Sequence, residues 1–496
     1  MRKSEPQKKG RLAPDRAKKN GQGGKAGKRQ QTGALPGTGS PYLTADERAA
    51  KGRSLRDTTP RASQAGWSPP SNRSDPVELL KESNAGRMLD LVPIRFGRMS
   101  SSPFAFYRGA AAIMAADLAH TPSCGIRVQA CGDAHLMNFG GFATPERNII
   151  FDINDLDETL PAPFEWDLKR LAASVVIAAE HLALSRSDAA RVVTDLVRGY
   201  RERIFDYAWM RALDVWYDRI DVQKYTDRTG NPEVVAAARK RFAARIETER
   251  RKSVPDHLYP KLVSEEGEQP RIKDEPPLIF HPNEDLAPGL KTGYAEALAS
   301  YRESLPEQTR ILFDRFHFSD LAVKVVGVGS VGTMCGVALF LAADNDPLFL
   351  QIKEARASVL EPYAGKSQHL NQGQRVIVGQ RLMQSASDVF LGWTRGQNGR
   401  DFYIRQLRDM KLSAVIEDWD IGMLRQYGRM CAHALARAHA RSGDAAMIAG
   451  YMGSGHTFDD AISEFATEYC SQNRSDYRAF VSAIREGRIK AMVDDG

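Results

Sequence analysis

The sequence predicts a two-lobed α+β protein, and three observations support this prediction. The chain has 496 residues, 42% of them hydrophobic and 26% charged, which is more than one core usually fills. Apolar runs of strand length gather between residues 317 and 411, and helical periodicity dominates on either side. A Pro-rich, charge-rich stretch at 253–293 is the best internal boundary. We therefore expect a helical lobe at 77–316, a strand-rich lobe at 317–411, and C-terminal helices at 412–496 that complete the helical lobe.

The first 76 residues predict a disordered basic tail. This segment is rich in Gly, Lys, Arg, Gln, Ser and Pro and poor in large apolar side chains that could offset the entropy of ordering. Residues 1–30 contain eleven Lys and Arg and carry a net charge of +9, so the rest of the chain sums to −2. A polybasic arm can bind phosphate backbones. Nucleic acid is therefore a possible partner only through this tail.

Cysteine content and hydropathy restrict the class of protein further. Five scattered cysteines without a C-x-x-C pair argue against a disulfide framework and against a thiolate zinc site. The basic start is not followed by the apolar run of a secretory signal. The longest apolar run, at 171–184, is interrupted by Glu180 and His181 and is too short to span a bilayer. We expect no membrane span and a reducing, cytoplasmic location.

Periodicity predicts the individual elements. Apolar residues at helical spacing predict helices at 77–89, 104–118, 165–184, 188–217, 232–252, 295–316, 372–387, 420–441 and 457–470. Short apolar runs bounded by turn residues predict strands at 126–131, 148–153, 321–326, 333–341, 347–352, 388–393 and 401–407.

A first group of polar residues follows the first predicted strand. Asp133 and Asn138 stand five residues apart in a turn, and Asp152 closes the next strand. Phosphoryl transfer needs a group that orients or deprotonates the acceptor, together with oxygen ligands for Mg²⁺. We predict the first role for Asp133 and the second for Asn138 and Asp152. Asp155 and Asp157 could substitute for Asp152, or cap the next helix, but Asp152 terminates the strand.

A second group is a G-x-G-x-x-G run at 327–332. The pattern alone is weak evidence, so the residues that follow it decide its meaning. A dinucleotide-binding fold requires a helix there, whereas residues 334–341 are followed by a turn and another apolar strand. We predict a glycine-rich hairpin over phosphates. The predicted cofactor-binding residues are Gly327, Gly329, Ser330, Gly332 and Lys353.

Lys353 ends the third predicted strand of this block, after alternating apolar residues. Kinases place their phosphate-binding lysine in this position. The acidic partner that such a lysine needs is not evident from the sequence. Glu361 is close along the chain, and the helix predicted at 372–387 offers only glutamines.

Two resemblances follow from these residues. Gly-Asp-Ala-His-Leu-Met-Asn at 132–138 resembles the H-G-D-x-H-x-x-N catalytic loop of aminoglycoside phosphotransferases and choline kinases, and Phe151-Asp152 resembles their metal-binding I-D. Cys131 replaces the first His of that loop. The wider sequence, including 102–109, 165–170 and 403–407, is similar to the bacterial domain of unknown function 2252 family. This second resemblance implies no established reaction.

The kinase resemblance implies a protein-kinase-like fold in permuted order. In ordinary kinases the glycine loop and the lysine precede the catalytic loop, whereas here they follow it. A circular permutation reconciles the two orders, because a fold tolerates new termini where the old connection is exposed. The helix at 420–441 resembles the helix that leads into the catalytic loop. By this resemblance Lys353 contacts the α- and β-phosphates of ATP, and the backbone of 327–332 covers them.

The sequence thus predicts ATP- and Mg²⁺-dependent transfer to a hydroxyl or amine of an unidentified small molecule. The carboxylates of Asp133 and Asp152 should then face one cleft with the ammonium of Lys353. Arg108, Arg170 and Arg405 are candidates for phosphate binding, although pairing with Asp or Glu is the commoner role. The alternatives are a nucleotide-binding pseudokinase without turnover and a dinucleotide-dependent oxidoreductase. A helix at 334–341 would favour the oxidoreductase.

Overall fold

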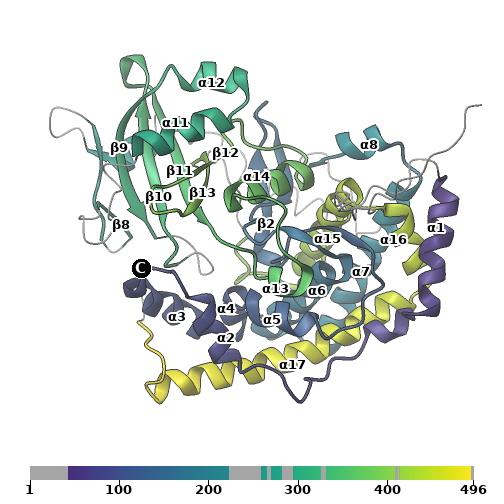
Figure 1. Ribbon diagram of the computed structural model, residues 1–496. Coiled ribbons are helices and arrows are strands. Elements are labelled where there is room, and N and C mark those ends of the chain that lie inside the picture. The colour runs from purple at the N-terminus through teal and green to yellow at the C-terminus, as the bar shows by residue number, and fades with distance from the viewer. Residues whose placement is uncertain are drawn as a thin grey trace, which may run out of the picture. The chain divides into compact units, whose positions relative to one another are not determined.

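The computed structural model describes residues 43–222, 258–264, 270–276, 278–281, 294–325, 331–407, 412 and 414–492. These residues form the mixed α+β fold that the sequence predicts (Figure 1). The helices are α1 (Ala45–Ser54), α2 (Pro76–Ser83), α3 (Val92–Ser100), α4 (Pro103–Gly109), α5 (Ala111–Leu118), α6 (Phe164–His181), α7 (Arg186–Ala208), α8 (Ala212–Tyr217), α10 (Tyr259–Leu262), α11 (Tyr294–Ser304), α12 (Glu307–Phe313), α13 (Glu361–Ala364), α14 (Gln372–Met383), α15 (Ile421–Ser442), α16 (Ala445–Met452) and α17 (Thr457–Arg485). The strands are β1 (Arg127–Ala130), β2 (Phe139–Ala143), β3 (Ile149–Ile153), β4 (Leu160–Pro163), β5 (Ile220–Asp221), β6 (Val263–Ser264), β7 (Arg271–Ile272), β8 (Ile279–Phe280), β9 (His317–Lys324), β10 (Cys335–Leu341), β11 (Pro347–Ala355), β12 (Gly392–Arg395) and β13 (Asp401–Gln406). The helix predicted at 232–252 lies outside the described residues.

The strand-rich segment forms one antiparallel sheet in the order β12-β13-β11-β10-β9-β8. In this sheet Lys353 of β11 lies between Cys335 of β10 and Tyr403 of β13. Apolar side chains of α11 and α12 pack on one face of the sheet, and α14 packs against β12 and β13. Because side chains alternate along a strand, Lys353 and its neighbour Ile352 point to opposite faces.

Residues 335–341 form the strand β10, as the sequence predicts, and not the helix that a dinucleotide-binding fold requires. β10 pairs along its whole length with β11 and also pairs with β9. The helix that would have favoured a dinucleotide-dependent oxidoreductase is therefore absent at residues 335–341.

The largest core of the described residues lies among the helices that precede and follow this sheet. α6 is the central element, because residues Phe164–His181 are buried around nearly the whole helix. α7, α15 and α17 pack around it, and α17 also reaches α2 and α4 (Figure 1). Segments from both ends of the chain therefore share this core. α17 ends at Arg485, beyond the predicted end at 470, because its buried residues continue at helical spacing.

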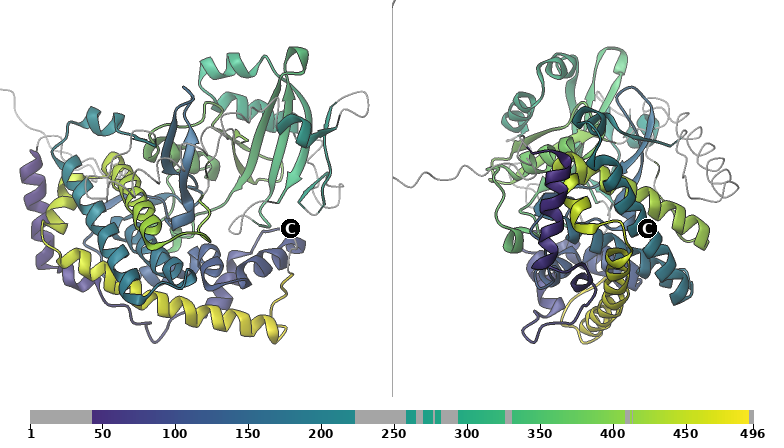
Figure 2. Two further views of the ribbon diagram at one scale, coloured as in Figure 1. Left: turned by 180° about the vertical axis from the view of Figure 1, so that it is seen from behind. Right: turned by 90° about the vertical axis from the view of Figure 1, so that its right-hand side faces the viewer.

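The structure corrects the later part of the prediction that residues 1–76 are disordered, because residues 43–76 contain α1 and two short 3-10 helices. Residues 1–42 lie outside the described residues. Thr44 and Glu47 form a capping box at the start of α1. α1 then packs against α16 so closely that a Cβ atom on Gly52 would lie 2.0 Å from the carbonyl oxygen of Met447 (Figure 2). Composition does not reveal this segment, because backbone contacts hold α1 with little burial of large apolar side chains.

Smaller differences concern the ends of elements. The helical segment predicted at 104–118 is two helices separated at Ala110. The strand predicted at 388–393 begins only at Gly392, because Asp388 instead accepts hydrogen bonds from the backbone of Phe390 and Gln406. Within the described part of the chain, no helix combines the length and apolar character that crossing a bilayer requires.

Candidate functional site

Two loops, one with Asp133 and Asn138 and the other with Asp155 and Asp157, meet because two short strand pairs hold their ends. The loop at 131–138 connects β1 to β2, and the loop at 154–159 connects β3 to β4. β1 pairs with β4, and β2 pairs with β3. The backbone N–H of Asn154 also donates to the carbonyl oxygen of Asn138 at 2.7 Å. Both loops therefore emerge side by side.

The buried carboxylate of Asp167 fixes the backbone of the loop at 131–138. Asp167 of α6 accepts the backbone N–H groups of Cys131 at 2.6 Å and of Gly132 at 2.9 Å. The Nε2 atom of His439 lies 3.2 Å from the same carboxylate. Gly132 has a φ of +83°, and a Cβ atom there would lie 2.5 Å from the carbonyl oxygen of Glu158. Only glycine fits this turn without strain.

Asp133 follows this turn, and Arg170 holds its carboxylate in one orientation. Arg170 donates to Oδ1 of Asp133 from Nη2 at 2.5 Å and from Nε at 2.8 Å. The guanidinium of Arg170 lies 4.2 Å from the ring centroid of Tyr107. Arg170 contacts Oδ1 of Asp133, and the Nε2 atom of His135 lies 3.8 Å from the other oxygen, Oδ2.

Oxygen ligands for a divalent cation are present in the two loops. Asn138 donates its amide N–H to the carbonyl oxygen of Asp133 at 2.8 Å, which fixes the amide group. Asn138, Asp133 and Asp155 line the same cavity. No group of three or more His, Cys, Asp or Glu side chains suited to a metal occurs among the described residues. Mg²⁺ commonly binds through one or two carboxylates together with substrate phosphates, so this donor set fits it.

Lys353 meets the second loop. Its ammonium lies 2.7 Å from the carboxylate of Asp157 and 3.7 Å from that of Asp155. The hydroxyl of Tyr403 also donates to Asp157. Burial by itself would lower the pKa of Lys353, but the two carboxylates outweigh it and raise the pKa well above its usual value. The side chain therefore keeps its positive charge although it is only 4% exposed.

The acidic partner of Lys353 thus comes from neither of the places considered from the sequence. Glu361 accepts a hydrogen bond from Gln372 instead. α14 contributes Arg375, which donates to the carbonyl oxygens of Asp157 and Thr159 and so holds the second loop in place.

Asp152, predicted as a metal ligand, has a different environment. Its carboxylate is fully buried and pairs with the fully buried Arg437 at 2.5 Å. Its second oxygen accepts the N–H and the hydroxyl of Ser385 at 2.9 and 3.0 Å. A cation there would have to displace Arg437. Asp155, which lines the cavity, is therefore a more accessible candidate ligand than Asp152.

The predicted glycine hairpin is described only in part. Gly327, Gly329 and Ser330 lie outside the described residues. Gly332 has a φ of +86°, and its carbonyl oxygen accepts the N–H of Met88 at 2.7 Å. The segment that follows α2 therefore contacts Gly332, the last glycine of the predicted hairpin.

A cavity of about 290 Å³ lies where these segments meet. We call it the charged cavity, and its charged and amide lining side chains are Asp133, Asn138, Asp155, Asp157, Glu158 and Glu354 together with Glu82, Arg87, Arg95, Arg108 and Arg356. Of the three arginines considered from the sequence, only Arg108 lines it. Arg170 pairs with Asp133, and Arg405 donates to Gln351 at 3.1 Å. Sequence reasoning missed Arg87, Arg95 and Arg356, and no motif marks them.

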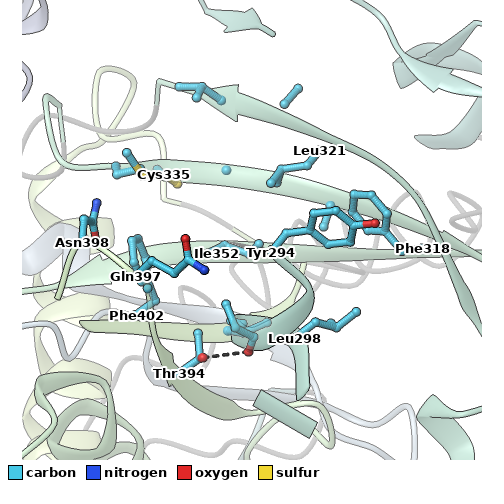
Figure 3. Close-up of a pocket in the computed structure, with 18 of the residues that line it drawn as sticks. Tyr294, Leu298, Phe318, Leu321, Cys335, Ile352, Thr394, Gln397, Asn398 and Phe402 are labelled. Carbon is cyan, nitrogen blue, oxygen red and sulfur yellow. Dashed lines mark hydrogen bonds between the residues drawn. The ribbon is translucent and has the colours of Figure 1, made fainter. Parts of the chain in front are cut away.

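A second cavity differs in character. It has a volume of about 130 Å³ and lies between α11 and the sheet, where Tyr294, Leu298 and Phe318 form its wall (Figure 3). Gln397 and Asn398 stand at its edge. No charged side chain among the described residues lines it, and none of the predicted site residues does. It offers no groups for phosphoryl chemistry.

The fold and the site define an α+β protein in which two loops between short strands line one charged cavity, and a lysine of an antiparallel sheet pairs with the second loop. Of the three residues predicted to face one cleft, only Asp133 lines this cavity, whereas Lys353 and Asp152 do not. A protein family described as "Uncharacterized protein conserved in bacteria (DUF2252)" matches residues 87–483, and the chain belongs to this family. No curated protein and no solved structure matches the chain.

Proposed function

We propose that this protein is an ATP- and Mg²⁺-dependent phosphotransferase that acts on a hydroxyl or amine of a small molecule. One observation carries the proposal: Asp133, Asn138 and Asp155 line one cavity, and the same acidic loop pairs with Lys353. Phosphoryl transfer requires an acceptor-orienting carboxylate, oxygen ligands for the metal and a cation for the phosphates.

Each side chain has a role that its position supports. Asp133 accepts the proton of the acceptor group while the acceptor atom forms a bond to the γ-phosphorus. The bond from that phosphorus to the bridging oxygen breaks, and ADP leaves with the electron pair. Asn138 and Asp155 would hold Mg²⁺, which neutralises charge on the phosphate oxygens when it is bound. Lys353 contacts the α- and β-phosphates from the sheet.

The order of the segments supports a permuted kinase-like arrangement as part of this proposal. β9, β10 and β11 are three neighbouring antiparallel strands, with glycines between the first two and Lys353 on the third. Kinases use a glycine-rich loop and a lysine on the third strand in this way. Here α15, which follows the sheet in sequence, contacts β1 and β3 on either side of the candidate catalytic loop.

One feature favours a second candidate, a nucleotide-binding pseudokinase without turnover. Lys353, the proposed phosphate ligand, lies 2.7 Å from Asp157 and 3.7 Å from Asp155, the proposed metal ligand. Each charge therefore already has a partner within the protein. An enzyme must separate this pair when MgATP enters, whereas a pseudokinase could keep it.

Calorimetry and an assay of ADP release test the proposal. Wild-type protein should bind ATP in the presence of Mg²⁺, and D133N should bind it with similar affinity while ADP release falls at least 100-fold. D206N, which changes an exposed carboxylate of α7, is the matched control and should leave both properties unchanged. Binding without ADP release in the wild type, across a panel of small alcohols and amines with and without a phosphate group, would leave the pseudokinase. Absence of ATP binding would remove both candidates.

A further inference from the structure

The charged cavity is lined by six acidic side chains and four arginines. The loops at 131–138 and 154–159 supply four of the acids, whereas Glu82 of α2 and Glu354 of β11 lie close along the chain to the arginines. Arg87, Arg95, Arg108 and Arg356 form a second group, which we call the arginine wall. Three of the four come from the segment at 87–108, and the fourth follows β11. Arg356 also joins the end of β11 to the end of α2, just before that segment, because it donates to the carbonyl oxygens of Ser83 and Ala85.

The hydrogen bonds of the arginine wall leave its charge unneutralised. Arg87 donates to the carbonyl oxygens of Val331 and Ser83. Arg95 donates to the amide oxygen of Asn84 and the carbonyl oxygen of Gly109. These acceptors are neutral, and no ion pair joins any of the four guanidiniums to a carboxylate of the described residues. Three other buried arginines, Arg170, Arg201 and Arg437, each pair with an aspartate, whereas the buried Arg375 also donates to neutral oxygens.

Arg108 is the least satisfied of the four. Its Nε atom is buried without a hydrogen-bond partner among the described residues, as is that of Arg95. Unlike Arg95, Arg108 donates no hydrogen bond from its other guanidinium nitrogens to the described residues. Its strongest attraction is to Asp133, although the two form no ion pair. A guanidinium without acceptors is costly to bury, so an acceptor oxygen that contacts its terminal nitrogens would be favoured.

The acids that face the arginine wall are engaged by other cations or by backbone N–H groups. Asp133 pairs with Arg170, and Asp157 pairs with Lys353. Glu354 pairs with Arg400 at 3.0 Å, and Glu158 accepts the N–H of Val359. Glu82, at the exposed rim, forms no ion pair with these arginines. Asp155 lies 3.7 Å from Lys353. Among the described residues the lining acids therefore have other partners or stand at the rim, and none of them forms an ion pair with the arginine wall.

The arginines also repel one another. Burial, and then the neighbouring charge of Arg356, lowers the pKa of Arg87 to about 10, although the carboxylates of Glu158, Glu354 and Asp157 oppose this shift. Burial, together with Arg87 and Arg356, lowers the pKa of Arg95 well below its usual value. An anion between them would relieve this repulsion, and guanidinium groups match the geometry of phosphate oxygens.

We infer that the arginine wall binds a phosphate group of the acceptor, so that the substrate is a phosphorylated small molecule with a free hydroxyl or amine. This inference rests on the proposed function. Arg108 is attracted to Asp133, where the acceptor must lie, whereas Lys353 lies beyond Asp155 and Asp157 and serves the nucleotide phosphates. In the transfer step only the acceptor's free oxygen or nitrogen gains a bond to phosphorus. The phosphate on the arginine wall stays intact and positions that atom beside Asp133. A cavity of about 290 Å³ suits a small acceptor.

Titration calorimetry with inorganic phosphate and with glycerol phosphate, in low salt and without nucleotide, tests the anion site. Wild-type protein should bind both probes, and R108Q should bind them at least 10-fold more weakly. R108K keeps the charge but loses the forked donor geometry, so it should fall between the two. R191Q removes an exposed arginine of α7 and should bind like the wild type. Thermal unfolding of each variant shows whether it is folded. Equal binding by R108Q and the wild type, or no binding by the wild type, would overturn the inference.

A second titration separates the acceptor phosphate from a nucleotide phosphate. Phosphate affinity should persist when a non-hydrolysable ATP analogue and Mg²⁺ saturate the protein. Competition between the analogue and phosphate would assign the arginine wall to the nucleotide and overturn the acceptor role. These titrations measure binding and need no turnover. The phosphate site can therefore be refuted while ATP turnover still supports the proposed phosphotransferase. Arg108-dependent phosphate binding without any turnover would leave an anion site and refute the transferase.

Discussion

The ammonium of Lys353 lies 2.7 Å from the carboxylate of Asp157, although 196 positions separate the two residues in the chain. This pair joins the antiparallel sheet to the loop that follows β3, and it lies beside the charged cavity. Lys353 is almost completely buried, whereas Asp157 is 29% exposed. The contact therefore links two parts of the fold, and the carboxylate of Asp157 is still exposed enough for a ligand to reach it.

The Lys353–Asp157 pair should show strong energetic coupling. We expect K353M and D157N each to lower the free energy of unfolding, and the double variant to lose less than the sum of the two. Removing one partner leaves the other charge uncompensated, so the coupling energy should be about 1–3 kcal/mol. Urea denaturation of the four proteins measures it. The exposed pair of Lys81 and Glu78 in α2 is the control and should show coupling below about 0.5 kcal/mol. Additive losses at Lys353 and Asp157 would contradict the assigned contact.

Substitution by asparagine should lower the stability of the protein at Asp152 and its affinity for Mg²⁺ at Asp155. D152N leaves the fully buried Arg437 without its counter-ion, and we expect a loss of stability of about 3–5 kcal/mol. Asp155 is 37% exposed, so D155N should change stability by about 1 kcal/mol or less. D155N should instead weaken Mg²⁺ binding in the presence of ATP at least 10-fold.

Urea denaturation and Mg²⁺ titration of the two variants check this contrast, each variant serving as the control for the other. If D152N remained as stable as the wild type and lost Mg²⁺ affinity, the original assignment of Asp152 from the sequence would be right after all.

These two aspartates also show how far the sequence could specify the site. Spacing placed Asp133 and Asn138 in one loop, because strand, turn and strand follow each other within a short stretch. The same stretch offered Asp152, Asp155 and Asp157 as ligands, and an apolar run does not reveal which of them faces the loop. In the structure β3 is buried throughout, so Asp152 points to α15 and the residues after the strand face the cavity.

The arginine wall could not be predicted for a different reason. It combines residues of the segment at 87–108 with Arg356, and only the folded chain brings them together. The partner of Lys353 was missed in the same way, because Asp157 lies in the helical half of the sequence. In contrast, β9, β10 and β11 were predictable, since alternating apolar residues and clear turns are local signals.

The buried imidazole of His135 should make stability fall in mild acid. Burial lowers the pKa of His135 to about 4, against 6.5 for an exposed histidine, with the nearby Asp133 opposing and Arg170 and Arg108 reinforcing this shift. Between these values the unfolded chain binds the proton and the folded chain does not. The contribution of His135 is therefore fully present above pH 6.5 and is lost as the pH falls toward 4, by about 3 kcal/mol in total.

H135N should flatten this part of the pH profile, because asparagine does not titrate and its oxygen can replace Nδ1 as acceptor for the N–H of Met137. Urea denaturation at pH 7, 6, 5 and 4.5 measures the slope for each protein. H120N, at an exposed position, controls for loss of an imidazole. A slope for H135N as steep as that of the wild type would assign the acid sensitivity to other groups, among them His433, whose pKa burial also lowers.

The close approach of α1 and α16 should make Gly450 sensitive to a single methyl group. A Cβ atom on Gly450 would lie 2.0 Å from the carbonyl oxygen of Ala49, and the backbone on both sides leaves no flexible side chain to move. We expect G450A to lower the free energy of unfolding by about 1–3 kcal/mol. G455A adds the same methyl group where nothing lies within 4 Å and is the control. Limited proteolysis should cut G450A within residues 45–54 faster than it cuts G455A, because the clash separates α1 from α16. Equal stability and equal protection of the two variants would show that α1 does not dock on α16 in solution.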